Sequence, residues 1–296
     1  MRQNISQESG ATNKYVLLVF VTALLWSLGG VLIKSIDWNP IAIAGSRSLI
    51  GSLLMLIVMP RAFRSITWRS VPGAIALSVT VILFVAATKM TTAANAIFLQ
   101  YTAPIYIALF SPWVLKERIG WLDWLLIIIA VFGTGLFFLD RLSVDNLWGI
   151  LLALTSGLSY AWLTILLRLQ RNASPEAAAL LGNILTFIFG IPWMFPPVHL
   201  AQNAPWLLLL GVFQLGLPYM IYAIAIRHVR ALDASVICMI EPVLNPIWVM
   251  LVTNERPATW SVAGGAIVLL TSLTRTLMAA RKAQPLRSSD IPGTEN

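Results

Sequence analysis

The chain alternates long apolar runs with short polar segments, and each run is about as long as a membrane-crossing helix. A helix needs about 20 mostly apolar residues to cross the hydrocarbon core. The predicted spans are Tyr15–Ile33, Pro40–Met59, Val71–Thr88, Ala93–Leu115, Trp121–Leu139, Leu147–Leu167, Pro175–Phe195, Pro205–Ile226, Leu232–Val252 and Thr259–Ala279. Backbone polar groups need internal partners inside a bilayer, and the alternation typical of barrel strands is absent. We therefore expect an all-α membrane protein with about ten transmembrane helices.

The polar ends of the chain frame these spans. The first span follows Lys14, as a signal peptide would, but it is too long and nine more follow, so we expect a retained helix. Residues 1–14 predict a cytoplasmic N-terminal tail that is unstructured to about residue 13. Residues 281–296 are basic and contain two prolines, which predicts a disordered cytoplasmic C-terminal tail.

Basic residues collect on one side of the predicted spans. Of the 20 Lys and Arg residues, only Lys34, Lys89, Arg141 and Arg256 fall in loops on one side. Arg47 lies within a span, and the others fall on the opposite side or in the tails. The positive-inside rule then places both termini in the cytoplasm, as an even number of spans requires.

The composition agrees with a membrane protein: 58% of residues are hydrophobic and 11% are charged, against about 25% charged in a soluble domain. The net charge of +8 does not predict a nucleic-acid partner, because the basic residues are spread over short loops. Cys238 lies in an apolar run and is expected to be a small apolar residue. His199 and His228 are far apart and lack metal-ligand spacing, so we expect no metal and no cofactor.

The two halves of the sequence resemble each other. A shift of 138 residues places Lys89 on Arg227, Ala93 on Ala231, Ala96 on Ala234, Pro104 on Pro242, and Glu117-Arg118 on Glu255-Arg256, and a shift of 134 pairs Trp26 with Tyr160 and Lys34 with Arg168. Halves of five spans each must have opposite orientations in the membrane. Such inverted repeats are typical of secondary transporters, with the solute site near the midplane. We expect repeats at residues 15–140 and 141–280 around a central cavity.

Four segments resemble a known family. They are LLWSLGGVLIKS, NPIAIAGSRSLIGSLLML, TTAANAIFLQYTAPIYIALFSPWVLKERI and its echo RALDASVICMIEPVLNPIWVMLVTNERP. Their pattern resembles the EamA-type members of the drug/metabolite transporter superfamily, and the matched spacing from Pro104 and Pro242 to the following Glu-Arg is the most specific part. The resemblance implies a ten-helix fold in the bacterial inner membrane with alternating access. It also implies export of metabolites, often amino acids, or of drugs.

Glu241 is the first candidate for the site, because a charge at the centre of a membrane helix costs about 2.5–3.5 kcal/mol on insertion scales. It precedes Pro242, and Asn245 follows one turn later on the same face. Pro242 bends the helix and frees a carbonyl nearby. Glu241 either receives a cationic solute group or a proton, or it is a protonated acid that serves packing. Its first-half equivalent is Ala103, which favours a functional role.

Arg47 is the second candidate. It lies about seven residues into the second span and could hold an anionic solute group or pair with a carboxylate. A role in helix packing, or snorkelling to the membrane surface, stays open.

Further mid-span side chains could wall the cavity. These candidates are Trp26, Gln100, Tyr101, Tyr160, Trp162, Tyr219 and Tyr222. Gln214, Pro218 and Tyr222 share one face of the eighth span, and Pro104, Pro218 and Pro242 are predicted hinges. The charged Lys116-Glu117-Arg118 and Glu255-Arg256 segments at span ends predict ion pairs that fix loops, or gates.

Together these features predict a secondary transporter that exports amino acids or related small metabolites by alternating access. A multidrug or lipophilic-cation efflux protein of the same fold is the alternative, since Glu241 and aromatic walls suit an organic cation. No P-loop is present, and the spans are poor in the nucleophiles and bases of an intramembrane enzyme, so we expect no enzyme. A sugar-phosphate carrier would need more basic groups than Arg47. The expected partners are a small-molecule solute and the lipid bilayer, with the chain a monomer or weak homodimer.

Overall fold

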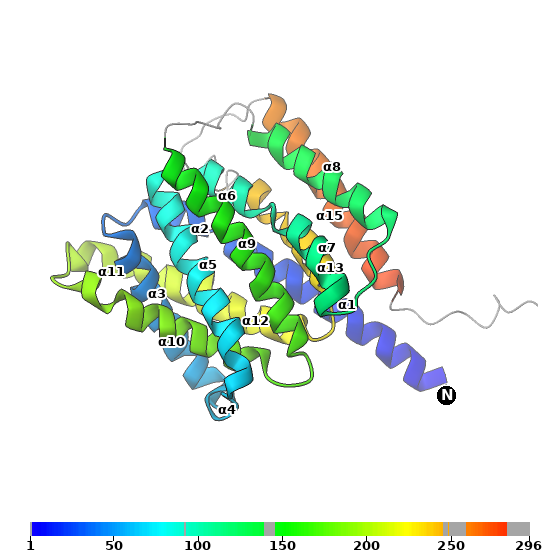
Figure 1. The fold of residues 1–296 in the computed structure, drawn as a ribbon, viewed down its shortest axis with the longest axis horizontal. Helices are drawn as coiled ribbons and strands as arrows, with labels where there is room; N and C mark the ends of the chain where they lie inside the picture. The colour runs from blue at the N-terminus through cyan, green and yellow to red at the C-terminus, as the bar shows by residue number, and fades with distance from the viewer. Residues whose placement is uncertain (1, 92, 139–145, 245–247, 249–258, 283–296) are drawn as a thin grey trace, which may run out of the picture.

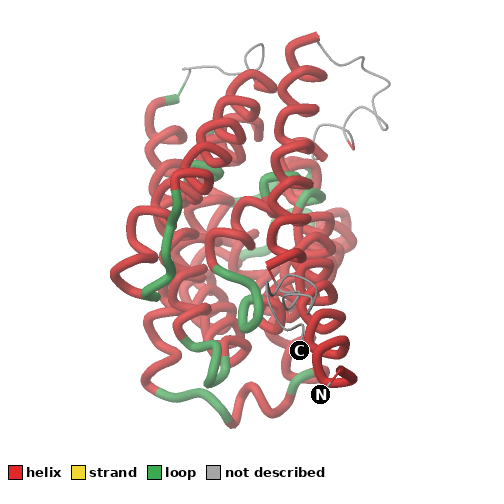
Figure 2. Tube along the Cα trace, turned by 90° about the vertical axis from the view of Figure 1, so that its right-hand side faces the viewer, coloured by secondary structure: helices red, strands yellow, loops and turns green. Residues whose placement is uncertain are grey.

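The computed structural model describes residues 2–91, 93–138, 146–244, 248 and 259–282. Their regular structure is helical throughout, which confirms the predicted all-α class (Figure 2). The helices are α1 (Arg2–Trp26), α2 (Gly29–Lys34), α3 (Pro40–Val58), α4 (Pro60–Arg64), η1 (Trp68–Ser70), α5 (Val71–Met90), α6 (Ala93–Gln100), α7 (Ala103–Val114), α8 (Trp121–Phe138), α9 (Leu147–Leu169), α10 (Pro175–Met194), α11 (Leu200–Leu209), η2 (Leu210–Gly216), α12 (Leu217–Ala225), α13 (Ala231–Cys238) and α15 (Thr259–Lys282).

Seven helical stretches among the described residues are long and apolar enough to cross a membrane. They are Asn13–Lys34, Pro40–Val58, Trp68–Met90, Asn95–Val114, Leu147–Leu169, Pro175–Met194 and Leu200–Ala225. Two shorter apolar helices, Trp121–Leu136 and Ala263–Arg275, coincide with the predicted fifth and tenth spans. The predicted ninth span, Leu232–Val252, lies partly outside the described residues, so the count of ten stays a prediction.

Several helices begin where the sequence supplies a cap. The side chain of Asn39 accepts a hydrogen bond from the Ile41 N–H, and Pro40 opens α3. Ser174 caps α10 in the same way, and Pro175 follows it. A side-chain acceptor before a proline satisfies a free N–H and presets the first helical φ angle, which explains these sharp starts.

Three of the predicted spans are interrupted along their length. Helix α1 ends at Trp26, and α2 begins at Gly29 after a turn formed by residues 27 and 28. Helix α6 ends at Gln100 and α7 begins at Ala103, while α13 ends at Cys238 and a further helical segment begins at Glu241. The second and third breaks each precede a proline, whose missing N–H cannot continue the helix. Broken helices leave backbone groups free within the membrane, which is tolerated only inside protein or beside a cavity.

Helix bounds repeat along the chain. Helix α13 has the same length as α6 and lies 138 residues further on, and α15 begins 138 residues after the start of α8. The break after α6 and the break after α13 therefore fall at matching positions, as the sequence shift predicts.

Helix packing also repeats between the two halves: helices at equivalent positions make equivalent contacts (Figure 1). Helix α5 packs on α9, and its counterpart pair is α12 on α1. Likewise α10 packs on α5 as η2 packs on α3, and α6 packs on α9 as α13 packs on α1. Helix α3 packs on α10 and α8 on α15, which are pairs of counterparts. These contacts between the halves thus occur in matching pairs, the arrangement expected of two repeats around a two-fold axis.

One local prediction is wrong. Helix α1 begins at Arg2, so residues 2–13 are helical where an unstructured tail was expected. The apolar turns that follow provide a helix nucleus, and no proline interrupts the polar residues before them. Within the predicted eighth span, residues Leu210–Gly216 form the π-helix η2, a local feature that the sequence analysis did not predict. Beyond Lys282 the predicted C-terminal tail lies outside the described residues.

Candidate functional site

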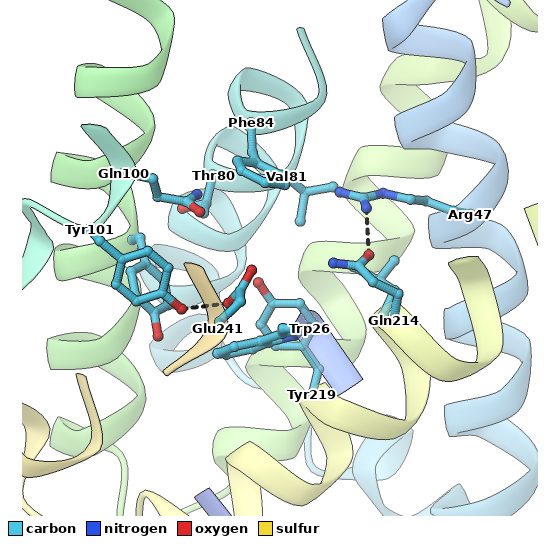
Figure 3. A pocket seen from close by; sticks show the side chains of 12 residues that line it. Trp26, Arg47, Thr80, Val81, Phe84, Gln100, Tyr101, Gln214, Tyr219 and Glu241 are labelled. Atoms are coloured by element: carbon cyan, nitrogen blue, oxygen red, sulfur yellow. Dashed lines mark hydrogen bonds between the residues drawn. The ribbon is translucent and has the colours of Figure 1, made fainter. Parts of the chain in front are cut away.

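A small cavity lies between the two halves of the bundle, where the helices are interrupted (Figure 3). Its volume is about 40 Å³, which is room for only a few water molecules. It is lined by Trp26, Arg47, Thr80, Val81, Phe84, Gln100, Tyr101, Tyr160, Gln214, Leu215, Tyr219 and Glu241. Both halves of the sequence supply lining residues. Trp26, Tyr101 and Glu241 each stand at one of the three helix breaks.

Among the described residues, Glu241 is the only carboxylate that lines this cavity. Its side chain is buried, and the Tyr101 hydroxyl donates a hydrogen bond of 2.5 Å to Oε2 (Figure 3). No Lys, Arg or His of the described residues forms an ion pair with it. The break that ends α13 turns this carboxylate into the cavity next to Tyr101.

In the part of the chain that the structure describes, Arg47 is the only basic residue of the lining. It is 1% exposed, and its Nη1 donates a hydrogen bond of 2.6 Å to Oε1 of Gln214. Its Nε is buried without a hydrogen-bond partner. No Asp or Glu within the described ranges pairs with it. Arg47 is therefore a buried cation held by a neutral amide.

Gln214 reaches Arg47 because of two backbone features. It belongs to the π-helix η2, and π-helical turns occur frequently at functional sites. It also lies against Gly29, where an added Cβ would come 2.8 Å from Gln214 Nε2. The missing side chain at Gly29 leaves the space that the amide occupies.

Aromatic rings form one wall of the cavity. Trp26 makes edge contacts with Tyr219 at 5.2 Å and with Tyr160 at 5.9 Å between ring centroids. Behind them, Tyr222 is fully buried, 5.2 Å from Trp26, with its hydroxyl 3.1 Å from the hydroxyl of Thr164. These rings place large apolar faces beside Glu241.

Most of the sequence-predicted site residues meet at this cavity. Trp26, Arg47, Gln100, Tyr101, Tyr160, Tyr219 and Glu241 line it. Tyr222 supports the wall from behind, whereas Trp162 is not among the lining residues and stacks on Phe110 at 5.2 Å. Trp162 is two residues from Tyr160, about 200° around the helix, and so faces away. Asn245 lies outside the described residues. Pro104, Pro218 and Pro242 are all buried, and their role as hinges stays a prediction.

Sequence reasoning did not single out four lining residues. They are Thr80, Val81, Phe84 and Leu215. Thr80 is the only one with a polar side chain, and its hydroxyl also bonds to the Ala76 carbonyl and to Ser159. The sequence did contain a signal for these residues: Thr80 is polar and lies in the middle of the third span, and Phe84 follows one turn later.

A second group of buried charges lies outside the cavity. Asp123 of α8 accepts a hydrogen bond of 2.5 Å from Arg275 of α15 and lies 3.6 Å from Arg230, and Arg275 also pairs with Asp233. Glu117 pairs with Arg168 at 2.9 Å instead of with its sequence neighbour Arg118. Here every buried acid has a cation beside it.

Arg168 and Lys34, equivalent in the two halves, act alike. Arg168 donates to the carbonyls of Ile226 and Arg227 beyond the end of α12. Lys34 donates to the carbonyl of Thr91 at the end of α5, at 3.0 Å. Both satisfy carbonyls that a helix end leaves free. Nearby, His228 stacks on Tyr15, and burial together with Arg168 and Arg227 lowers the pKa of its imidazole.

No cluster of three or more His, Cys, Asp or Glu side chains able to hold a metal occurs in the part of the chain that the structure describes. The cavity lining offers one carboxylate, one guanidinium, two amides and several aromatic faces, and each of these groups can bind a solute.

Comparison with known proteins places this arrangement in a family. The model of the EamA-like transporter family matches the chain twice, over residues 13–139 and 147–274. An uncharacterized transporter of Archaeoglobus fulgidus is 24% identical over 265 residues, covering 85% of this chain and 92% of the relative. The pseudopaline exporter CntI of Pseudomonas aeruginosa is 28% identical over 268 residues, covering 86% and 93%.

A solved structure titled only as the crystal structure of a protein has the same fold. It superposes with a TM-score of 0.75 at 19% identity, covering 91% of this chain and 98% of its own. The two matches of the family model fit the two halves seen in sequence and packing. The predicted resemblance is confirmed, and the chain is a multi-pass membrane protein that belongs to the EamA-like transporter family.

Proposed function

We propose that this protein is a secondary transporter that exports amino acids or related small metabolites across the inner membrane by alternating access. One observation carries the proposal: the polar cavity lies between the two repeats, where three spans are interrupted. Solute sites of transporters with inverted repeats occupy this position. Membership of a transporter family, and similarity to a relative named as a pseudopaline exporter, support the same function.

The ion pairs outside the cavity support a mechanism in which the bundle closes at one end. Arg168 joins α9 to Glu117 and to the end of α12, and Glu117 also accepts the Ala231 N–H at the start of α13. These contacts tie elements of both repeats together at the predicted cytoplasmic end. Opening that end requires them to break, while the repeats rock about the hinges Pro104, Pro218 and Pro242.

A multidrug efflux protein is the second candidate. Trp26, Tyr160 and Tyr219 surround the region of Glu241, and aromatic faces beside a carboxylate suit an organic cation. Buried Arg47 opposes a purely cationic solute, which favours the metabolite exporter.

Purified protein in liposomes tests the function directly. Counterflow of radiolabelled amino acids should exceed that of empty liposomes, and the Trp162→Phe variant, altered outside the cavity, should match the wild type. Counterflow confined to lipophilic cations would favour the multidrug alternative. No counterflow of any solute, by protein shown to be folded, would refute the transporter proposal.

The proposed topology has its own test. Cys238 is the one cysteine in the sequence, so a Cys238→Ala background permits single-cysteine labelling. Cysteines introduced at Ser6 and Ser288 should both react with an impermeant reagent only from the cytoplasmic side. Labelling from opposite sides would contradict two inverted five-helix repeats.

A further inference from the structure

The cavity contains two opposite charges that do not pair with each other. Arg47 and Glu241 both line it and both are buried, yet they form no ion pair, although both belong to the described residues. A buried charge without a counter-ion is costly, and a direct pair would be the simplest relief. The fold keeps them apart: Arg47 projects from α3, and Glu241 stands at the break after α13 (Figure 3).

Neutral groups hold both charges in place. The amide of Gln214 accepts from Arg47, and the hydroxyl of Tyr101 donates to Glu241. These are the interactions that a carboxylate and an ammonium group would make more strongly, because charge-assisted hydrogen bonds are stronger than neutral ones. Arg47 also keeps its buried Nε without a partner, and a guanidinium with free donors fits a carboxylate in a two-point contact.

The rings beside Glu241 complete the cation side. Trp26 and Tyr219 lie beside the carboxylate in Figure 3, and ring faces attract a positive nitrogen. The carboxylate of Glu241 and the neighbouring rings therefore both favour a cationic group, whereas Arg47 favours an anionic one.

We propose that the cavity selects a zwitterion, a small solute that carries a cationic nitrogen and a carboxylate on one skeleton, with Glu241 and Arg47 as the specificity-determining residues. This inference rests on the proposed function and narrows its substrate class. When the solute binds, its nitrogen replaces the Tyr101 hydroxyl as the hydrogen-bond donor to Glu241. Its carboxylate replaces the Gln214 amide oxygen as the acceptor from Arg47. In the compact state described here the cavity, about 40 Å³, is too small for such a solute, so binding accompanies a widening of the site.

The test compares matched solutes on the full-length protein. Each α-amino acid of a panel is compared with its methyl ester, which keeps only the cation, and with the acid lacking the amine, which keeps only the anion. Binding is followed by thermal stabilisation in detergent, and transport by competition for counterflow in liposomes. The zwitterion should act at about 10- to 100-fold lower concentration than either analogue, since each analogue loses one charged contact.

Charge variants separate selectivity from folding. Glu241→Gln should reduce the advantage of the amino acid over the amine-free acid, and Arg47→Gln should reduce its advantage over the ester. Arg47→Lys and Glu241→Asp keep the charges and should keep the wild-type order of preference. If the two residues had a purely structural role, their variants would bind and transport all three solutes less well and leave the order of preference unchanged.

Two results would overturn the inference. Esters or amine-free acids that compete as well as the amino acids would remove zwitterion selection while leaving transport intact. Variants that bind all three solute classes in the wild-type order would remove Glu241 and Arg47 as its determinants. Absence of any counterflow would instead refute the proposed function, so the two failures are distinguishable.

Discussion

Two groups of buried charges among the described residues are built differently. Between α8, α13 and α15, Arg275 contacts both Asp123 and Asp233, so acid and base compensate each other. At the cavity, Arg47 and Glu241 have only a neutral amide and a neutral hydroxyl as hydrogen-bond partners among the described residues. Pairing in the first region holds helices together. The lack of pairing in the second leaves each charge available to a solute, and the two regions should therefore respond oppositely to loss of charge.

The largest expected effect is on the paired region. Arg275→Met leaves buried Asp233 without the cation that pairs with it and leaves Asp123 only the more distant Arg230. Loss of one partner from a buried pair costs about 3–5 kcal/mol. We expect a large fall in the thermal unfolding temperature in detergent. Arg61→Met, at an exposed position, is the matched control and should change little. Equal unfolding temperatures for the two variants would show that the paired charges do not stabilise the fold.

At the cavity, Glu241→Gln should reduce transport and leave thermal stability unchanged, the opposite of Arg275→Met. The amide keeps the shape of the side chain and can still accept from Tyr101, so the unfolding temperature should stay close to that of the wild type. Counterflow should fall by about 10- to 100-fold, because a charged contact to the solute is lost. Its dependence on pH should also flatten, since the variant cannot take up a proton. A wild-type pH profile in the variant would remove Glu241 from the mechanism.

Tyr101→Phe sharpens the comparison with a smaller change. It removes the 2.5 Å hydrogen bond to Glu241 and keeps the ring. A hydrogen bond to a charged group contributes about 1.5–3 kcal/mol, and in the variant the solute nitrogen no longer has to displace it. Affinity for the amino acid should therefore rise, by up to about tenfold. Trp162→Phe, on the opposite side of α9 from Tyr160, serves as control in the same competition assay. If both variants behave alike, Tyr101 does not orient the carboxylate.

Gly29→Ala should have the smallest effect. The added methyl would lie 2.8 Å from Gln214 Nε2, so the amide must shift away from its position on Arg47. Because the end of a Gln side chain is flexible, stability should change little. A solute carboxylate no longer has to displace the amide from Arg47, so we expect about a threefold gain of affinity for carboxylate-bearing solutes. Gly135→Ala, where the new Cβ would make ordinary contacts with Phe98 at 3.6 Å, is the control.

Local features of the sequence predicted most of the fold. Apolar length identifies the spans, and Asn39-Pro40 and Ser174-Pro175 place two helix starts. The cost of charge inside the membrane pointed to Glu241 and Arg47, which both line the cavity. Such properties depend on a residue and its near neighbours, so a single sequence contains them.

Other features depend on distant parts of the chain. The contact of Arg47 with Gln214 joins residues 167 positions apart, and it requires the π-helix η2, which follows from packing rather than from residue pattern. The pairing of Glu117 with Arg168, in place of its neighbour Arg118, is decided by how α9 approaches the loop before α8. Trp162 was chosen for its aromatic ring, but its direction depends on which face of α9 meets the cavity.

The double variant Arg47→Met/Glu241→Met tests most directly whether the cavity charges serve a solute rather than the fold. Replacing buried charges by apolar side chains of similar size is often neutral or stabilising. The account predicts an unfolding temperature equal to or above that of the wild type, together with loss of amino-acid counterflow. A fall in unfolding temperature as large as that of Arg275→Met, or retained counterflow, would contradict it.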